Sequence, residues 1–222
     1  MARPETLDGL ASLARSFPLT SRPNHLVWHG SDPRVDALRG SLLRQRGVTA
    51  WLTGLSGAGK STISAHAEHR LLEAGVAAVR LDGDNLRHGL NSGCGFDASG
   101  RAEAVRRAGE AAVLLSGAGL VTLVGMISPY RADRERVRAR HAEAGVAFLE
   151  VFVDVPLAVA EARDPKGLYA RARAGELRGF TGVDDPYEPP TAPEIRLATD
   201  VDGTETCVDS LVESILAVAR RD

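Results

Sequence analysis

Eight consecutive residues constrain the fold of this chain more than any other feature: Gly54-Leu55-Ser56-Gly57-Ala58-Gly59-Lys60-Ser61. They fit the pattern G-x-x-x-x-G-K-[S/T] and lie between a short apolar run, Val48–Thr53, and a helical pattern over 61–73. In this setting the glycines let backbone N–H groups turn toward a phosphate, and the helix N-terminus adds partial positive charge. Lys60 is expected to reach the β- and γ-phosphates, and the Ser61 hydroxyl to bind Mg²⁺. A glycine-rich turn without a ligand would leave both residues unexplained, so the sequence predicts a nucleoside triphosphate site.

Strand and helix patterns alternate along the rest of the chain. Further strands are expected at 76–81, 120–127, 147–153 and 195–197, and further helices at 103–116, 131–144, 157–162 and 205–219. Residues 120–127 are apolar throughout, which is typical of a strand covered on both faces. The alternation predicts a three-layer α/β fold with a central, mainly parallel sheet and helices on both faces.

The chain divides into an arm, a domain and a lid. Residues 1–47 contain scattered prolines and are expected to form an N-terminal arm with a short helix near 35–46, packed on the domain or on a second subunit. The domain is expected to span residues 48–222. Within it, residues 163–190 are polar and rich in Arg and Pro, which is typical of a mobile lid.

Composition excludes several classes of protein. The net charge of −2 gives no global positive field that would attract nucleic acid or anionic lipid. No apolar run reaches the ~18–20 residues that span a bilayer, and the N-terminal residues do not resemble a signal peptide. Cys94 and Cys207 are too few for a disulfide framework and do not fall at metal-ligand spacing. We therefore expect a cytoplasmic protein with reduced thiols and with neither nucleic acid nor a membrane as partner.

The basic residues are unevenly chosen. Lys60 and Lys166 are the only lysines among 27 basic residues, so these two positions are candidates for sites that need a compact ammonium group. The Arg-rich run 131–140 is expected to form a solvated helix face whose charges alternate with Asp133, Glu135 and Glu143.

The loop alone does not decide between a kinase, a GTPase and a motor. The chain has no Asn-Lys-x-Asp motif, and the strand pattern over 120–127 is followed by no acidic residue. Acidic residues instead follow the second strand, at Asp82 and Asp84, with Arg87 close by. Carboxylates at the carboxyl end of a strand face the ligand crevice of an open α/β sheet, which favours a small-molecule kinase. In an extended segment the two carboxylates would point the same way and share a metal or proton role, although a plain turn is the alternative.

Further blocks of residues follow the loop in order: LDGDNLRHGLN at 81–91, ISPYR at 127–131, DPKGLY at 164–169, RARAGE at 171–176, GFTG at 179–182 and DPYE at 185–188. Together with residues 53–62 they resemble the adenylylsulfate (APS) kinase family, from about Trp28 to Thr199. A phosphate loop is common, whereas this series of blocks is highly specific. The resemblance implies a P-loop kinase that transfers the γ-phosphoryl group of MgATP to the ribose 3′-hydroxyl of APS. The product would be 3′-phosphoadenylylsulfate (PAPS), in sulfate activation, and the resemblance also suggests a homodimer.

The resemblance implies a role for each matched residue. Asp84 would take or orient the proton of the hydroxyl, Arg87 and Arg101 would bind the phosphosulfate, and Phe96 and Phe180 would enclose the adenine. The catalytic residues would be Asp84, Lys60, Lys166 and Ser128, with Lys166 neutralising charge between donor and acceptor. ATP would be bound by Gly54, Leu55, Ser56, Gly57, Ala58, Gly59, Lys60, Ser61 and Thr62. The acceptor would be bound by Asp84, Asn85, Arg87, Phe96, Arg101, Ile127, Ser128, Lys166, Gly179 and Phe180. Mg²⁺ would be held by Ser61, with Asp82 as a possible second ligand.

The sequence departs from the family on the acceptor side. Ala104 stands where the family carries Asn, Gly100 where it carries Asp, and Gly125-Met126 where a Phe is common. A lost charge-assisted hydrogen bond weakens binding by about 1.5–3 kcal/mol. The departure therefore leaves two hypotheses for the identity of the acceptor. One is APS in a modified pocket; the other is a related nucleotide with a different base or 5′ group, such as a phosphoramidate. A non-catalytic nucleotide-binding partner is a third alternative. A gluconate- or shikimate-type kinase is disfavoured, because paired phenylalanines suit a flat base better than a polyol.

Overall fold

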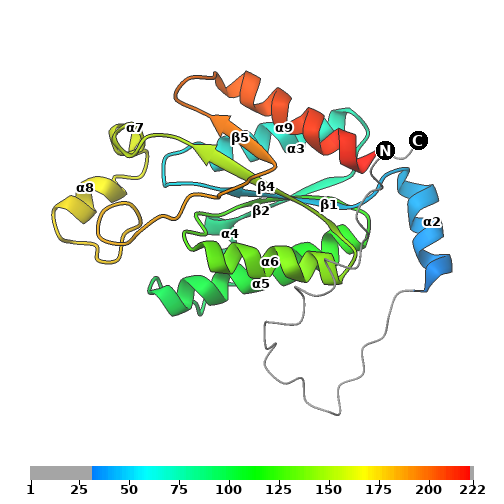
Figure 1. The fold of residues 1–222 in the computed structure, drawn as a ribbon, viewed down its shortest axis with the longest axis horizontal. Helices are drawn as coiled ribbons and strands as arrows, with labels where there is room; N and C mark the ends of the chain where they lie inside the picture. The colour runs from blue at the N-terminus through cyan, green and yellow to red at the C-terminus, as the bar shows by residue number, and fades with distance from the viewer. Residues whose placement is uncertain (1–31, 221–222) are drawn as a thin grey trace, which may run out of the picture.

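The computed structural model describes residues 32–220, in which five parallel strands form one sheet between two layers of helices (Figure 1). The strand order is β2-β3-β1-β4-β5. This arrangement confirms the predicted three-layer α/β fold. The strands are β1 (Val48–Thr53), β2 (Ala78–Asp82), β3 (Val121–Gly125), β4 (Ala147–Asp154) and β5 (Ile195–Ala198).

Each face of the sheet is covered by a pair of helices. α3 (Lys60–Glu73) and α9 (Thr204–Ala219) lie on one face, and α5 (Ala98–Gly117) and α6 (Arg131–Glu143) on the other (Figure 1). Side chains alternate along the central strand β1, so that Ala50 and Leu52 join the core beside α3 and α9 while Trp51 joins the core beside α5. The remaining helices are α2 (Pro33–Leu43), α4 (Gly83–Arg87), α7 (Leu157–Arg163) and α8 (Leu168–Arg173). None of the helices among residues 32–220 is long and apolar enough to cross a membrane.

The carboxyl ends of the strands bring the phosphate loop and the acidic segment to one edge of the sheet. In the register, Gly125 at the end of β3 is paired with Leu52 of β1 on one side and with Asp82 of β2 on the other. Ligands of open α/β sheets bind at this edge, outside the carboxyl ends of the strands. The fold therefore places the loop after β1 beside the acidic turn after β2.

Two segments differ from the sequence prediction because side chains cap helices there. The turn after β2 is the short helix α4, whose first turn is capped by the Asp82 carboxylate. The expected extended geometry of Asp82 and Asp84 is therefore wrong. Helix α5 begins at Ala98 rather than at residue 103, since Asp97 accepts a hydrogen bond from the Gly100 N–H at 2.8 Å.

The arm predicted for residues 1–47 lies mostly outside the described residues, including Trp28. Its described part contains helix α2, which ends at Leu43 because Arg44 adopts a left-handed conformation with φ 51°. Gln45 is buried and its side chain exchanges hydrogen bonds with the backbone of Ala77 and donates to the carbonyl of Gly119. This residue fastens the start of the domain to the amino ends of β2 and β3.

The segment 163–190, predicted as a lid, is anchored to the domain by buried side chains. Tyr169 of α8 and Thr181 are both 1% exposed. The Tyr169 hydroxyl donates to the carbonyl of Ser56 in the phosphate loop at 3.1 Å. At the other end, Tyr187 stacks on Phe152 of β4. We keep the name lid segment for residues 163–190.

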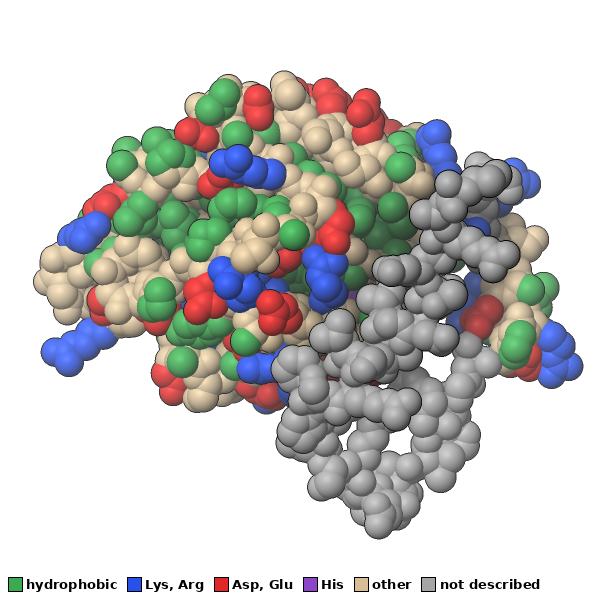
Figure 2. All heavy atoms as spheres, viewed as in Figure 1, with side chains coloured by type: hydrophobic (Ala, Val, Ile, Leu, Met, Phe, Trp, Pro, Cys, Tyr) green, Lys and Arg blue, Asp and Glu red, His purple; other side chains and the backbone are tan. Residues whose placement is uncertain are grey.

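Helix α6 departs from the expected solvated face. Acidic and basic side chains lie intermixed over α5 and α6 in Figure 2. Two charged residues of α6, Asp133 and Arg134, are nevertheless buried, at 4% and 1% exposure. The prediction of a fully solvated Arg-rich face is therefore wrong at these positions.

Candidate active site

The phosphate loop is held in a conformation that only glycine can adopt at several positions. Gly54 and Gly57 have φ of 153° and 75°. A Cβ atom would lie 2.4 Å from the carbonyl oxygen of Val153 at Gly54, and 2.8 Å from that of Ala160 at Gly57. The loop thus needs glycine both for its backbone conformation and for its close approach to β4 and α7.

Lys60, the first residue of α3, points into the centre of this loop. Its Nζ donates to the carbonyl oxygens of Gly54 and Leu55 at 2.9 and 2.7 Å. Burial and the nearby positive charge of Lys166 lower the pKa of Lys60 to about 8. Because burial and Lys166 both disfavour the charged form, an anionic ligand bound beside this ammonium group would stabilise it.

Ser61 and Asp82 form a polar pair beside Lys60. The Ser61 hydroxyl donates to Asp82 Oδ2 at 2.7 Å, while Asp82 Oδ1 accepts from the backbone N–H of Asp84 at 3.0 Å. Burial favours a raised pKa for Asp82, but the hydrogen bonds from Ser61 and from the backbone of Asp84 and Asn85 outweigh it and lower that pKa. The carboxylate is therefore ionised. A hydroxyl and an ionised carboxylate are oxygen ligands of the kind that Mg²⁺ prefers.

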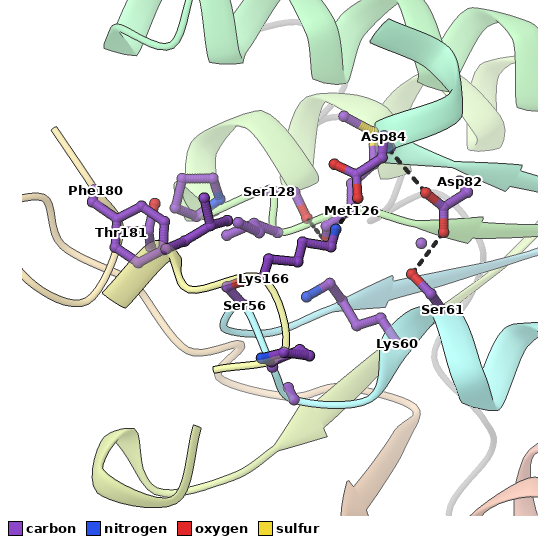
Figure 3. A pocket seen from close by; sticks show the side chains of 18 of the residues that line it. Ser56, Lys60, Ser61, Asp82, Asp84, Met126, Ser128, Lys166, Phe180 and Thr181 are labelled. Atoms are coloured by element: carbon purple, nitrogen blue, oxygen red, sulfur yellow. Dashed lines mark hydrogen bonds and ion pairs between the residues drawn. The ribbon is translucent and has the colours of Figure 1, made fainter. Parts of the chain in front are cut away.

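Asp84 serves a different partner from Asp82. Its carboxylate forms an ion pair with Lys166 of the lid segment, and both side chains are exposed. Figure 3 shows Lys166 extending toward Asp84 while Lys60 lies below it, beside Ser61. Both lysines of the chain thus lie in the same site, although they are far apart in the sequence.

These residues line a cavity of about 950 Å³. It brings together most of the residues predicted for the two substrates, and Figure 3 shows part of its wall. Gly54, Leu55 and Asn85 do not line it. The predicted residues that do are Ser56, Gly57, Ala58, Gly59, Lys60, Ser61, Thr62, Asp82, Asp84, Arg87, Phe96, Arg101, Ile127, Ser128, Lys166, Gly179 and Phe180.

The two phenylalanines lie in different surroundings. Phe96 is 67% exposed and carries the Arg87 guanidinium over its ring, 3.9 Å from the centroid. Phe180 meets Tyr169 edge-on, with ring centroids 5.0 Å apart. Arg101 connects the two walls, since it donates to the carbonyl oxygens of Phe96 and Gly179 and to the Thr181 hydroxyl.

Ser128 occupies a sharp corner after β3. It is 2% exposed, and its φ of 40° lies in the left-handed region although it is not glycine and precedes Pro129. Its hydroxyl accepts a hydrogen bond from the indole N–H of Trp51 at 3.1 Å. The corner is a strained conformation that the surrounding structure must hold.

Sequence reasoning missed part of the cavity wall on the phosphate-loop side. Arg163, at the end of α7, donates to the carbonyl of Thr199 at 2.7 Å and to its hydroxyl at 3.1 Å. The Thr199 hydroxyl in turn donates to the carbonyl of Ala58 in the loop at 2.9 Å. The position of Thr199 directly after the last strand was an available signal, because the carboxyl ends of all five strands meet at this edge.

The structure shows the surroundings of two positions, 104 and 100, at which the sequence differs from the family pattern. Ala104 is buried at 1% exposure and lines the cavity, as do Val105 and Met126. Gly100 is explained by close packing, because a Cβ atom there would lie 2.6 Å from the backbone N and O atoms of Gly95. The glycine at this position is thus a requirement of the loop before α5.

A parallel sheet, a glycine-rich phosphate loop and a carboxylate facing that loop across one cavity define a P-loop kinase. Comparison with known proteins gives the family. The family model described as adenylylsulphate kinase matches residues 46–198. The chain therefore belongs to the adenylylsulphate kinase family, which confirms the resemblance.

Individual relatives cover nearly the whole chain. The adenylyl-sulfate kinase of Saccharomyces cerevisiae is 49% identical over 193 residues, which cover 87% of this chain and 95% of the relative. That of Enterobacter sp. (strain 638) is 48% identical over 204 residues, 92% of this chain and 98% of the relative. Among solved structures, the Mycobacterium tuberculosis APS kinase CysC in complex with AMPPNP and APS has a TM-score of 0.73 and 50% identity, covering 78% of this chain and 98% of that one.

Proposed function

We propose that this protein transfers the γ-phosphoryl group of MgATP to the ribose 3′-hydroxyl of adenylyl sulfate (APS), forming PAPS. The observation that carries the proposal is the single cavity in which Lys60 and the phosphate loop face Asp84. The 3′-oxygen forms a bond to the γ-phosphorus while the bond from that phosphorus to the β–γ bridging oxygen breaks. ADP leaves, and the hydroxyl proton passes to Asp84 or through it to water.

Asp84, Lys60 and Lys166 have different roles in phosphoryl transfer. Asp84 orients the hydroxyl for in-line attack, and phosphoryl transfer requires mainly positioning and charge stabilisation rather than a strong base. Lys60 binds the β- and γ-phosphates. Lys166 already reaches Asp84, so it is placed to neutralise charge that develops between donor and acceptor.

Magnesium is the metal that the donor set favours. Ser61 and Asp82 would hold it, directly or through water, because both present oxygen atoms beside Lys60. When bound, the ion neutralises charge on the β- and γ-phosphates. Gly125 of β3, the register partner of Asp82, also lines the cavity, and a Cβ atom there would lie 3.8 Å from Ser64 Oγ and 4.0 Å from Lys60 Cβ.

The acceptor is bound between the walls that Arg101 connects. Phe96 and Phe180 supply flat apolar surfaces for the adenine, and Arg87 is placed to meet the anionic 5′ group. The lid segment, residues 163–190, closes over both nucleotides and excludes water. The proposed kinase domain is residues 48–222, preceded by the arm predicted for residues 1–47, of which only residues 32–47 are described and Gln45 is bonded to the domain.

The test is an ADP-release assay with MgATP and APS. ADP release should depend on APS, and Asp84→Asn should lower kcat by about 10²-fold while the affinity for MgATP stays within about twofold. Asp209→Asn is the matched control, because Asp209 is an exposed aspartate that pairs with Arg70 away from the cavity. ADP release that ignores APS, or that Asp84→Asn leaves unchanged, would contradict the proposal.

The methyl group of Ala104 motivates a second arm of this assay. Adenosine 5′-phosphoramidate replaces APS as the acceptor, since a buried methyl group in the wall offers no hydrogen bond to the 5′ group. APS should give the higher kcat/KM. A higher value with the phosphoramidate would move the assignment to a kinase of a related nucleotide.

A homodimer in the cytoplasm completes the proposal. Helix α2 exposes Val35, Leu38 and Leu42 on one face, at 41%, 71% and 81%, and such a face is suited to burial against a second copy. Light scattering after gel filtration should give the mass of two chains. Leu42→Glu should lower that mass, whereas Leu114→Glu on α5, 70% exposed, should leave it unchanged; a monomeric wild-type protein would contradict the dimer.

Cys94 and Cys207 are free thiols, in keeping with a reducing compartment.

A further inference from the structure

Arg134 of helix α6 is a buried guanidinium outside the cavity wall. It is 1% exposed, and each of its donor groups has a different partner. Nε donates to the Glu150 carboxylate, Nη1 to the carbonyl of Ser128 and Nη2 to the carbonyl of Glu188, each at 2.7 Å. Burying a charge is costly unless it is paired, and Glu150 of β4 supplies the pairing carboxylate.

The first backbone partner is the strained corner after β3. Ser128 holds a left-handed conformation before a proline, and its side chain lines the cavity. Its carbonyl oxygen accepts the hydrogen bond from Arg134 at the point where the chain turns out of the sheet. Without that bond, the corner would lose a contact that opposes relaxation to an ordinary backbone conformation.

The second backbone partner belongs to the end of the lid segment. Beside the carbonyl that Arg134 binds, the Glu188 N–H donates to the carbonyl of Pro129 at 2.9 Å, and its carboxylate accepts from the Arg131 N–H at 2.7 Å. Residues 129–131 and 188 are thus joined by a short ladder of hydrogen bonds. Arg134 donates to the carbonyl of Ser128, next to residues 129–131, and to the carbonyl of Glu188, so it contacts both of the segments that these hydrogen bonds join.

We propose that Arg134 is a positioning residue that fixes the Ser128 corner to the carboxyl-terminal end of the lid segment. It acts through Ser128 and Glu188 and does not touch either nucleotide, since it does not line the cavity. In this role it sets the cavity wall beside the acceptor and the point from which the lid segment extends. The inference rests on the proposed function for its kinetic test, and on the structure alone for its exchange test.

Arg134→Lys is the informative variant, with Arg138→Lys as the matched control. Lysine keeps a positive charge near Glu150, but a single Nζ cannot hold three acceptors in the directions that a guanidinium reaches. Arg138 lies one turn further along α6 and also pairs with Glu150, at 3.3 Å, and with Glu194. It makes no hydrogen bond to Ser128 or Glu188, so it reports the effect of losing an α6 guanidinium that contacts Glu150 without contacting the corner or the lid segment.

Two measurements are made on each full-length variant. In the ADP-release assay, Arg134→Lys should lower kcat with APS about tenfold, because the reacting groups lose their alignment, while the dissociation constant of MgATP stays within about twofold. In hydrogen exchange, peptides covering 127–133 and 185–190 should exchange faster in Arg134→Lys than in the wild type. Arg138→Lys should match the wild type in kcat and in these two peptides.

Each contrary result overturns the proposal. These are a kcat for Arg134→Lys within twofold of the wild type, unchanged exchange in both peptides, or an equal loss of kcat in Arg138→Lys. If Arg134→Lys does not fold, Glu150→Gln takes its place, and unchanged kcat and exchange in that variant would likewise overturn the proposal. A wild-type protein that turns over no APS refutes the proposed function instead, and the exchange result then decides the role of Arg134.

Discussion

Raising the pH should weaken nucleotide binding through Lys60. The ammonium group is buried in the phosphate loop and lies near the charge of Lys166, and its pKa is lowered to about 8 from an ordinary value near 10.4. Bound phosphates bring negative charge to the same place and favour the protonated form. In the free protein the proton is lost as the pH rises through 8, so binding above that pH requires its return.

The size of the effect follows from the position of this pKa. Lys60 is neutral in about one tenth of the free molecules at pH 7, about half at pH 8 and about nine tenths at pH 9. Binding should therefore take up about 0.1, 0.5 and 0.9 protons at these three values. The dissociation constant should rise about twofold at pH 8 and about tenfold at pH 9, relative to pH 7. The terminal phosphate of the ligand is ionised across this range and adds little.

Isothermal titration calorimetry with a non-hydrolysable MgATP analogue measures both quantities. Titrations in two buffers of different ionisation enthalpy give the number of protons taken up, and the isotherms give the dissociation constant. Lys60→Arg is the control, because a guanidinium stays protonated throughout and the remaining affinity should not change with pH. A wild-type dissociation constant that is flat between pH 7 and 9, without proton uptake, would refute the environment inferred for Lys60.

Three further substitutions test separate parts of the site. Asp82→Asn should raise the Mg²⁺ concentration needed for half-maximal activity by about tenfold, because it removes the carboxylate beside Ser61; an unchanged Mg²⁺ titration would show that Asp82 does not serve the metal. Lys166→Met should lower kcat by about 10²-fold. It also removes the positive charge that lowers the pKa of Lys60, so the pH dependence of MgATP binding should move to higher pH; an unchanged pH dependence in calorimetry would contradict the interaction between the two lysines. Gly100→Asp should destabilise the fold by about 1–3 kcal/mol, because its Cβ meets the backbone of Gly95; an unchanged midpoint in urea denaturation would count against that packing.

The phosphate-loop half of the site could be predicted from sequence because it is local. Strand, loop and helix are consecutive in the chain, so the glycine pattern and the flanking apolar runs specify the arrangement of Gly54, Lys60 and Ser61 together. Strand β1 has the predicted bounds, and α3 begins one residue earlier than expected. Each step of that inference uses residues that are neighbours in sequence.

The acceptor half depends on residues that are far apart in sequence. The burial of Arg134 requires Glu150 from β4 and a carbonyl from the end of the lid segment, and no periodicity within the run 131–140 indicates either partner. Arg101 similarly contacts Gly179 and Thr181, about 80 residues away along the chain. The start of α5 at Ala98 depends on a neighbouring residue, because the Asp97 side chain caps the helix, and the expected start at residue 103 did not take that cap into account.

The use of lysine at only two positions gains a physical reason from the structure. Arginines elsewhere in the described chain often meet carboxylates with two nitrogens at once, as Arg106 meets Glu103, and a planar fork suits that geometry. Lys60 instead sits between two carbonyl oxygens of a tight loop, and Lys166 reaches a single carboxylate oxygen of Asp84. A compact ammonium group can move from these oxygens to a phosphate oxygen without the fixed plane of a guanidinium, and burial lowers its pKa to about 8 at Lys60, whereas a guanidinium stays protonated. The composition of this Arg-rich chain therefore marks the two places where a mobile point charge, rather than a rigid fork, serves phosphoryl transfer.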